Sequence, residues 1–83
     1  MRSFAIQPST TFNAMTGIFK TNIATPEERT NVLHAIRNNY EVGQCHVDLE
    51  DCDKVLRIVN MSVEENEMIK FVQQQGFNCE VLD

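Results

Sequence analysis

The sequence predicts a small α+β domain whose elements follow the order β-α-β-β-α-β. The first observation is a helix-start signal that follows a strand-like run twice, at residues 25–28 and 62–65. In each case a hydroxyl residue precedes a glutamate by three positions, which is the spacing of a capping box. The second observation is a stretch at 44–60 that reads as two strands around an acidic turn. The order therefore consists of one strand–helix unit, a two-stranded hairpin that leads into the second helix, and one final strand.

The first 16 residues differ from the rest of the chain. They are rich in Ser, Thr and Asn, and their apolar residues Phe4, Ile6, Phe12 and Met15 follow no clean period. We therefore expect an N-terminal arm at 1–16 and one folded domain at 17–83. An expression remnant and a short additional strand are the alternatives for the arm.

The first strand and the first helix follow the arm. Residues 18–23 are β-branched and aromatic, so we expect a strand with Phe19, Thr21 and Ile23 on one face. Residues 26–40 follow as a helix with Pro at its first position, where a missing N–H costs nothing. Apolar residues at 3.6-residue spacing form its expected core stripe: Val32, Leu33, Ile36 and Tyr40.

A hairpin is expected next. Apolar and polar residues alternate strictly over residues 44–50, which predicts a strand with one buried and one solvent-exposed face. Its inward residues are Cys45, Val47 and Leu49. The residues at 51–53 predict a turn, because Asp side chains bond their own backbone. The return strand is expected at 54–60, with inward residues Leu56 and Ile58 and outward residues Val55, Arg57 and Val59.

The second helix is expected at 63–75, with an apolar side formed by Met68, Ile69, Phe71 and Val72. Gly76 ends it, since glycine readily takes the left-handed conformation of a helix stop. Residues 78–82 form the last strand. Together the elements predict a ferredoxin-like sandwich, in which both helices cover one face of an antiparallel four-stranded sheet and the other face is open.

Composition narrows the function classes. The chain of 83 residues is 42% apolar and 23% charged, which is ordinary for one globular domain. Its net charge of −5 and its scattered Lys and Arg argue against nucleic acid and against an anionic membrane surface as partners. No apolar run is long enough to span a membrane and no secretory signal is present, so we expect a cytoplasmic protein. The odd number of cysteines, three, fits free thiols in a reducing compartment.

No residue pattern predicts an enzyme or a cofactor. Cys45 and His46 point to opposite faces of a strand, so they are not a nucleophile–base pair. The acidic residues at 48–53 lack the calcium-loop pattern and predict a solvated hairpin tip. RNA-recognition modules share this strand order, but the outward positions of the central strands carry no aromatic residue. An amino-acid-sensing regulatory domain is a further alternative, since such domains bind ligands at strand–helix loops.

The chain also resembles a known family. The resemblance is carried by four segments, at residues 20–23, 47–50, 53–56 and 76–79. Together they are similar to the heavy-metal-associated domain, which occurs in copper chaperones and in N-terminal modules of metal-transporting ATPases. The similarity covers residues 18–83. The resemblance implies a metal loop after the first strand, where the family carries Cys-x-x-Cys and two thiolates at a helix N-terminus bind Cu(I) or Zn(II).

Thr25 and Glu28 stand where the family has its two cysteines. A hydroxyl is a poor ligand for a soft metal, and a carboxylate is a hard one. We therefore expect a degenerate member that has lost the metal site and holds no cofactor. Cys45 and Cys79 offer no substitute, because they fall on the two edge strands, on the order of 14 Å apart, whereas ligands of one zinc lie ~4 Å apart. The alternative is weak or atypical binding of a heavy-metal ion through Glu28 or His46.

The expected function is a non-enzymatic binding or interaction module. Its open sheet face is expected to carry Ile18, Val55 and Val59 among Lys20 and Arg57, an apolar patch that a partner can cover. The candidate covers are the N-terminal arm, a second copy of the chain and an unknown protein partner. The strand edges also offer backbone pairing to another chain.

Overall fold

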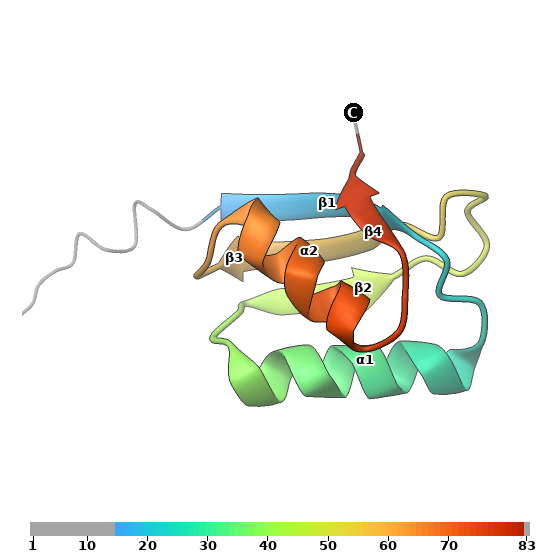
Figure 1. Ribbon diagram of the computed structural model, residues 1–83, viewed down its shortest axis with the longest axis horizontal. Helices are drawn as coiled ribbons and strands as arrows, with labels where there is room; N and C mark the ends of the chain where they lie inside the picture. Colours follow the sequence, from blue (N-terminus) through green and yellow to red (C-terminus); the bar gives the residue numbers. More distant parts are fainter. Residues whose placement is uncertain (1–14, 83) are drawn as a thin grey trace, which may run out of the picture.

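The computed structural model describes residues 15–82, which form two helices and a four-stranded antiparallel sheet (Figure 1). The elements follow the predicted order: β1 (Met15–Thr21), α1 (Pro26–Asn39), β2 (Gln44–Val47), β3 (Leu56–Met61), α2 (Glu65–Gln74) and β4 (Cys79–Val81). Strand β1 begins earlier than predicted, so Met15 and Thr16 belong to the sheet. The rest of the predicted arm, residues 1–14, lies outside the described residues.

The sheet has the strand order β2-β3-β1-β4, and every neighbouring pair is antiparallel. Strands β1 and β3 are therefore central, and β2 and β4 are the edges. Side chains alternate as predicted along β1, β2 and the first part of β3. The inward residues are buried: Phe19, Thr21, Cys45, Val47, Leu56 and Ile58. The outward residues Lys20, His46 and Arg57 are exposed.

A β-bulge interrupts the pairing of β1 with β3. Gly17 pairs with Ile58, but Met15 pairs with Met61, so β3 contains one extra residue. Asn60 has a φ of +57° at this place, in the left-handed region that Asn tolerates better than most residues. The extra residue turns Met61 inward, where it is fully buried. Strict alternation after Leu56 and Ile58 would place Asn60 inward and Met61 outward. For this reason the sequence prediction missed Met61 as a core residue.

Helix α1 ends one residue before the predicted Tyr40. In its predicted stripe, Val32 and Ile36 are fully buried, and Leu33 and Tyr40 are half-buried against the core. The Tyr40 ring meets Phe71 of α2 edge-on, with ring centroids 5.1 Å apart and an interplanar angle of 90°. This favourable aromatic contact joins the two helices.

Helix α2 begins later than the second helix-start signal predicts. Its N-cap is Glu64, whose side chain makes no capping hydrogen bond, so the predicted box between Ser62 and Glu65 is not the start of this helix. Strand β3 ends at Met61, so Ser62 lies in the bend between strand and helix. Val63 and Met68 take the N′ and N4 positions of a hydrophobic staple, and both belong to the core or pack against it.

The remaining predictions for α2 are confirmed. Met68 and Val72 are fully buried, and Ile69 and Phe71 are half-buried against the core. Gly76 follows the helix with a φ of +100°, the left-handed conformation expected of a helix stop.

One hydrophobic core joins the elements. Its buried side chains come from both helices, all four strands and the loop between β1 and α1: Phe19, Ile23, Val32, Ile36, Cys45, Val47, Leu56, Ile58, Met61, Met68, Val72 and Cys79. Every helix and strand therefore contributes at least one buried side chain to this core.

Candidate functional site

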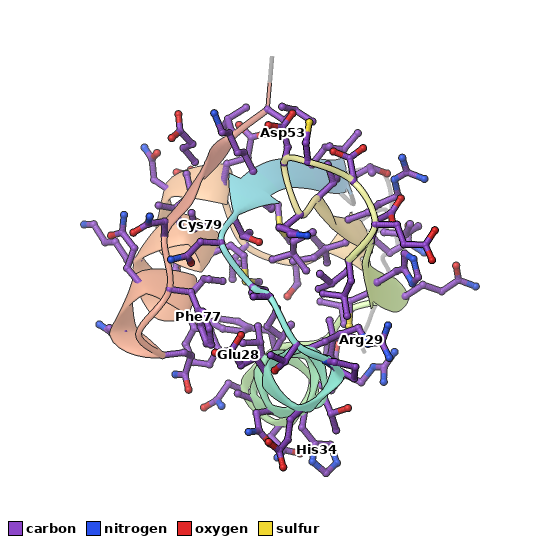
Figure 2. All side chains as sticks on the ribbon, turned by 90° about the vertical axis from the view of Figure 1, so that its right-hand side faces the viewer. Glu28, Arg29, His34, Asp53, Phe77 and Cys79 are labelled. Carbon is purple, nitrogen blue, oxygen red and sulfur yellow. The ribbon has the colours of Figure 1, made fainter. Side chains whose placement is uncertain are left out.

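Three loops meet at one end of the sheet, the end that faces the viewer in Figure 2. They are the β1–α1 loop at 22–25, the β2–β3 loop at 48–55 and the α2–β4 loop at 75–78. Antiparallel pairing brings the first and last together, because Thr21 at the end of β1 lies opposite Cys79 at the start of β4. The resemblance to heavy-metal-associated domains implies a metal loop here, so this end is the candidate site.

Hydrogen bonds tie the three loops to one another. The Thr21 hydroxyl donates to the Lys54 carbonyl over 2.6 Å and accepts the backbone N–H two residues further on. The Thr21 N–H donates to the carbonyl of Asp53. On the other side of β1, the Asn78 N–H donates to the side-chain oxygen of Asn22 over 2.8 Å. The end of β1 therefore fixes both neighbouring loops.

The capping box at the start of α1 is formed as predicted. The Glu28 N–H donates to the Thr25 hydroxyl oxygen over 3.0 Å. In return, one carboxylate oxygen of Glu28 accepts the N–H of Thr25 at 3.2 Å and the N–H of Ala24 at 2.9 Å. Thr25 has the extended backbone of an N-cap residue. Both side chains are thus engaged by backbone groups of their own loop.

Thr25 and Glu28 do not fit a soft metal ion. In such a loop Cu(I) and Zn(II) favour thiolates, which combine negative charge with polarisable sulfur. Here the hydroxyl is neutral, and the Glu28 oxygen that faces the loop already accepts two N–H groups. Binding a metal through these side chains would break bonds that stabilise the helix start by about 1 kcal/mol.

Two of the cysteines are buried on the edge strands, Cys45 on β2 and Cys79 on β4. Burial raises the pKa of the Cys79 thiol to about 12, and the charge of Glu80 adds to the effect. Burial also raises the pKa of the Cys45 thiol, against the opposing influence of Arg37. Both thiols stay protonated near neutral pH, so neither is a ready nucleophile or metal ligand.

The histidines lie on other surfaces. His34 projects from α1 into solvent (Figure 2). His46 is exposed on the outward side of β2, and its cross-strand neighbour is Arg57, whose positive charge disfavours a metal cation. Neither Glu28 nor His46, the residues considered for atypical metal binding, belongs to a group of three potential ligands among residues 15–82.

The turn after β2 contains the one such group in the described part of the chain. Ligand atoms of Asp51, Cys52 and Asp53 lie within 4.8 Å of one another. The tripeptide Asp-Cys-Asp is its sequence signal, but only the turn brings the three side chains together. An Asp51 carboxylate oxygen already accepts the Asp53 N–H over 2.8 Å, and Lys20 Nζ lies 4.0 Å from an Asp53 carboxylate oxygen. The group therefore offers two hard ligands, partly engaged, and one soft ligand.

The outward side of the sheet forms a surface that we call the outer face. It comprises Ile18, Lys20, Val55, Arg57 and Val59 on or beside the central strands, and Gln44, His46, Asp48 and Glu80 on or beside the edges. The register places His46, Arg57 and Ile18 in one row, and Lys20 beside Glu80. The apolar members are half-buried and the charged members are exposed, as the sequence predicts.

The two edges of the sheet differ. On β2, the Cys45 carbonyl accepts a hydrogen bond from Arg37 Nη2 of α1 over 3.4 Å. On β4, the Leu82 N–H continues the ladder to β1, so alternation turns the backbone groups of Cys79 and Val81 away from β1. None of the loop or side-chain hydrogen bonds among residues 15–82 reaches those groups. The β2 edge is thus partly capped, and the β4 edge is open to pairing.

Comparisons with known proteins identify no family. No protein-family model matches the sequence, no curated protein is significantly similar to it, and no significant match is found among solved structures. Within residues 15–82, neither helix has the length and apolar character needed to cross a membrane. The function must therefore be inferred from the residues and their geometry.

Proposed function

We propose that this chain is a non-enzymatic binding or interaction module that resembles a heavy-metal-associated domain and has lost its metal site. The observation that carries the proposal is the capping box of α1. The two positions aligned with the family's metal ligands hold Thr25 and Glu28, and both side chains bond the backbone of their own loop. These residues favour a helix start over the capture of a soft ion.

We further propose the finer fold, a ferredoxin-like sandwich with both helices on one face of the sheet. The element order and the strand order β2-β3-β1-β4 support it. The core supports it as well, because buried side chains of both helices join the inward side chains of the sheet. On the other side of the same strands, Lys20 and Arg57 are exposed. In this arrangement no helix among residues 15–82 covers the outer face, so a partner can reach it.

The thiols and histidines support a non-enzymatic role. The thiols of Cys45 and Cys79 are buried, with raised pKa values, and the exposed Cys52 lies between two aspartates and not beside a histidine. His34 and His46 occupy other surfaces. All three cysteines are free, which supports a cytoplasmic, reducing location.

A metal titration tests the loss of the site. Reduced protein is titrated with Cu(I), and separately with Zn(II), against a competing chelator. We expect no one-to-one complex of submicromolar affinity. The matched variant is Thr25→Cys/Glu28→Cys, which restores Cys-x-x-Cys at the same backbone positions. It is expected to gain a tight one-to-one Cu(I) site, because only the ligands, and not the loop, are missing.

A second candidate function, weak or atypical heavy-metal binding, is favoured by the Asp51, Cys52 and Asp53 group. The variant Cys52→Ser removes its soft ligand and leaves the capped loop unchanged. Tight binding by the unmodified chain that disappears in Cys52→Ser would overturn the loss of metal binding and place the ion in the β2–β3 turn. Tight binding that survives Cys52→Ser and disappears in Glu28→Gln would place it in the loop before α1.

A further inference from the structure

We propose that the open edge of β4 binds an extended strand of a partner protein, in which a Lys or Arg lies between two apolar residues. This inference rests on the proposed interaction function and adds to it the place of contact and the chemistry of the partner. Three features of β4 carry it: backbone groups that residues 15–82 do not engage, an exposed apolar side chain, and a carboxylate outside the one ion pair of those residues.

The backbone of β4 is paired on one side only, because β4 is an edge strand. The Leu82 N–H donates to the Ile18 carbonyl of β1. Since the direction alternates along a strand, the backbone groups of Glu80 also point toward β1, and those of Cys79 and Val81 point away from it. No loop or side-chain hydrogen bond among residues 15–82 reaches the latter groups. An antiparallel strand laid beside β4 would exchange two hydrogen bonds with each of these two residues.

Val81 adds an apolar contact at this edge. It is one of two large apolar side chains that are exposed in the described part of the chain, the other being Met15, and 36% of Val81 is accessible to solvent. Val81 alternates with Glu80, so it points to the same side of the sheet as the buried Cys79. An apolar side chain of an added strand would cover Val81 and extend the core toward the edge.

Glu80 places a negative charge at the middle of the same edge. Its neighbour on β1 is Lys20, but the one ion pair among residues 15–82 joins Lys20 to Asp53 at 4.0 Å. Two carboxylates therefore share one cation here, in a chain whose net charge is −5. In an antiparallel pair, the residue opposite Glu80 would be a non-hydrogen-bonded neighbour, whose Cα lies about 4.5 Å away. A Lys or Arg at that position is attracted, and an Asp or Glu is repelled.

The chain's own segments fit this edge less well. A second copy that satisfied all of these backbone groups in a symmetric pair would place Glu80 directly against the Glu80 of the other copy, where like charges are destabilising. Residues 1–14 hold one cation, Arg2, which is followed by Ser3 and so lacks an apolar neighbour on that side. Charge and residue pattern therefore favour a segment of a different protein.

A peptide titration of the full chain tests the proposal. The ¹⁵N-labelled protein is titrated with the capped peptide Thr-Val-Lys-Val-Thr and separately with Thr-Val-Glu-Val-Thr. The lysine peptide is expected to shift the backbone amides of Cys79 and Val81, because their N–H groups gain an acceptor. It is expected to bind roughly five-fold more tightly than the glutamate peptide, because the residue opposite Glu80 changes from attracted to repelled.

A lysine peptide that is N-methylated at both valines controls for the backbone. It keeps every side chain and loses the two N–H groups that would donate to β4, so it is expected not to bind. Equal binding of the methylated peptide would overturn the proposal, because strand pairing would then play no part. If the unmethylated lysine peptide in large excess shifts neither Cys79 nor Val81, the edge does not bind strands and the proposal is wrong.

Glu80→Lys tests the selection by charge. It keeps the open edge and reverses its charge, so the glutamate peptide is expected to become the tighter ligand. Glu41→Lys is the matched control, because it makes the same change of net charge at an exposed residue just before β2, the opposite edge strand. It should leave the preference for the lysine peptide within about two-fold at physiological salt, where distant charges are screened. Equal effects of both variants would overturn the proposal, since binding would then follow net charge alone.

Three further outcomes would reject this inference and leave the proposed interaction function standing. Peptide shifts confined to Arg57 and Val59 would move the contact to the outer face. Shifts of Cys79 and Val81 on dilution of the free protein would identify a second copy as the occupant of the edge. Changed shifts of the same two amides in the full-chain variant Arg2→Glu would identify the N-terminal segment as the occupant. None of these outcomes depends on the metal titration, which tests the lost site by itself.

Discussion

Glu28 is the residue on which the start of α1 depends most. One of its carboxylate oxygens satisfies the N–H groups of Ala24 and Thr25, which no carbonyl of the helix reaches. The Thr25 hydroxyl oxygen accepts one hydrogen bond, from the Glu28 N–H. The two side chains are therefore unequal, and the carboxylate carries the larger share of the cap.

Removal of the Glu28 side chain is expected to lower the free energy of unfolding by about 1–2 kcal/mol in Glu28→Ala, because two N–H groups lose their acceptor. Urea unfolding followed by circular dichroism measures the change. Glu27→Ala is the control, since Glu27 lies in the same first turn and takes no part in the box. It is expected to cost only about 0.3 kcal/mol through the helix dipole. Equal losses would mean that Glu28 acts by charge and not by capping.

The buried thiol of Cys79 predicts a dependence of stability on pH. Burial raises its pKa in the folded chain from 9.0 to about 12, so the folded state keeps a proton that the unfolded state releases in this interval. The stability that this thiol contributes is therefore complete below about pH 9 and is lost as the pH rises toward 12. Urea unfolding midpoints measure how steeply the stability falls with pH. They are taken in reducing buffer between about pH 8 and about pH 11. Cys79→Ala should give a flatter profile, and an unchanged slope would assign the effect to another group.

At the scale of elements, the two helix starts look alike in sequence and differ in structure. Helix α1 uses the hydroxyl and the glutamate that its signal predicts. Helix α2 uses neither Ser62 as cap nor Glu65 as its reciprocal partner, and its actual N-cap, Glu64, makes no side-chain bond. Its first turn therefore leaves N–H groups that a better cap can satisfy.

A hydroxyl placed at the true N-cap is expected to stabilise α2. Glu64→Ser should raise the free energy of unfolding by about 0.5–1 kcal/mol, because serine accepts an N–H of the first turn. Ser62→Ala should change it little, since Ser62 lies in the bend before the helix. Urea unfolding of both variants checks the assignment. A loss in Ser62→Ala without a gain in Glu64→Ser would mean that the helix starts at residue 62 in solution.

The elements that the sequence predicts well are those with a local cause. The spacing of Val32 and Ile36 and the alternation of Cys45 and Val47 depend on neighbouring residues alone, and so does the capping box before α1. The bulge at Asn60 is different, because it depends on the pairing of β3 with β1.

Contacts between distant residues account for the parts that the sequence did not predict. A Cβ at Gly17 would lie 2.6 Å from the Phe19 ring and 3.0 Å from the end of the Met61 side chain, so Gly17 leaves the space in which Phe19 of β1 and Met61 of β3 pack together. The bond from Arg37 to the Cys45 carbonyl and the convergence of ligands at 51–53 likewise appear only once the chain is folded.

At the scale of the whole molecule, the described residues 15–82 share one small core, which leaves little reserve of stability. Phe19→Ala removes a fully buried ring and is expected to cost about 3–5 kcal/mol, enough to unfold much of the population at 25 °C. Ile18→Ala alters the neighbouring residue on the outer face and should cost less than about 1 kcal/mol. Circular dichroism and thermal melting compare the two. A large cost for Ile18→Ala would mean that the outer face is covered in the free protein.

The unequal edges of the sheet limit how copies of the chain can add to one another. A sheet with two open edges can grow without end, as fibrils do. Here the β2 edge is engaged by Arg37, and the open edge is β4. Two chains joined through β4 would present only their β2 edges, where a third chain would have to compete with Arg37 for the Cys45 carbonyl. In the language of polymer chemistry, the chain is better suited to be an end group than a repeating unit.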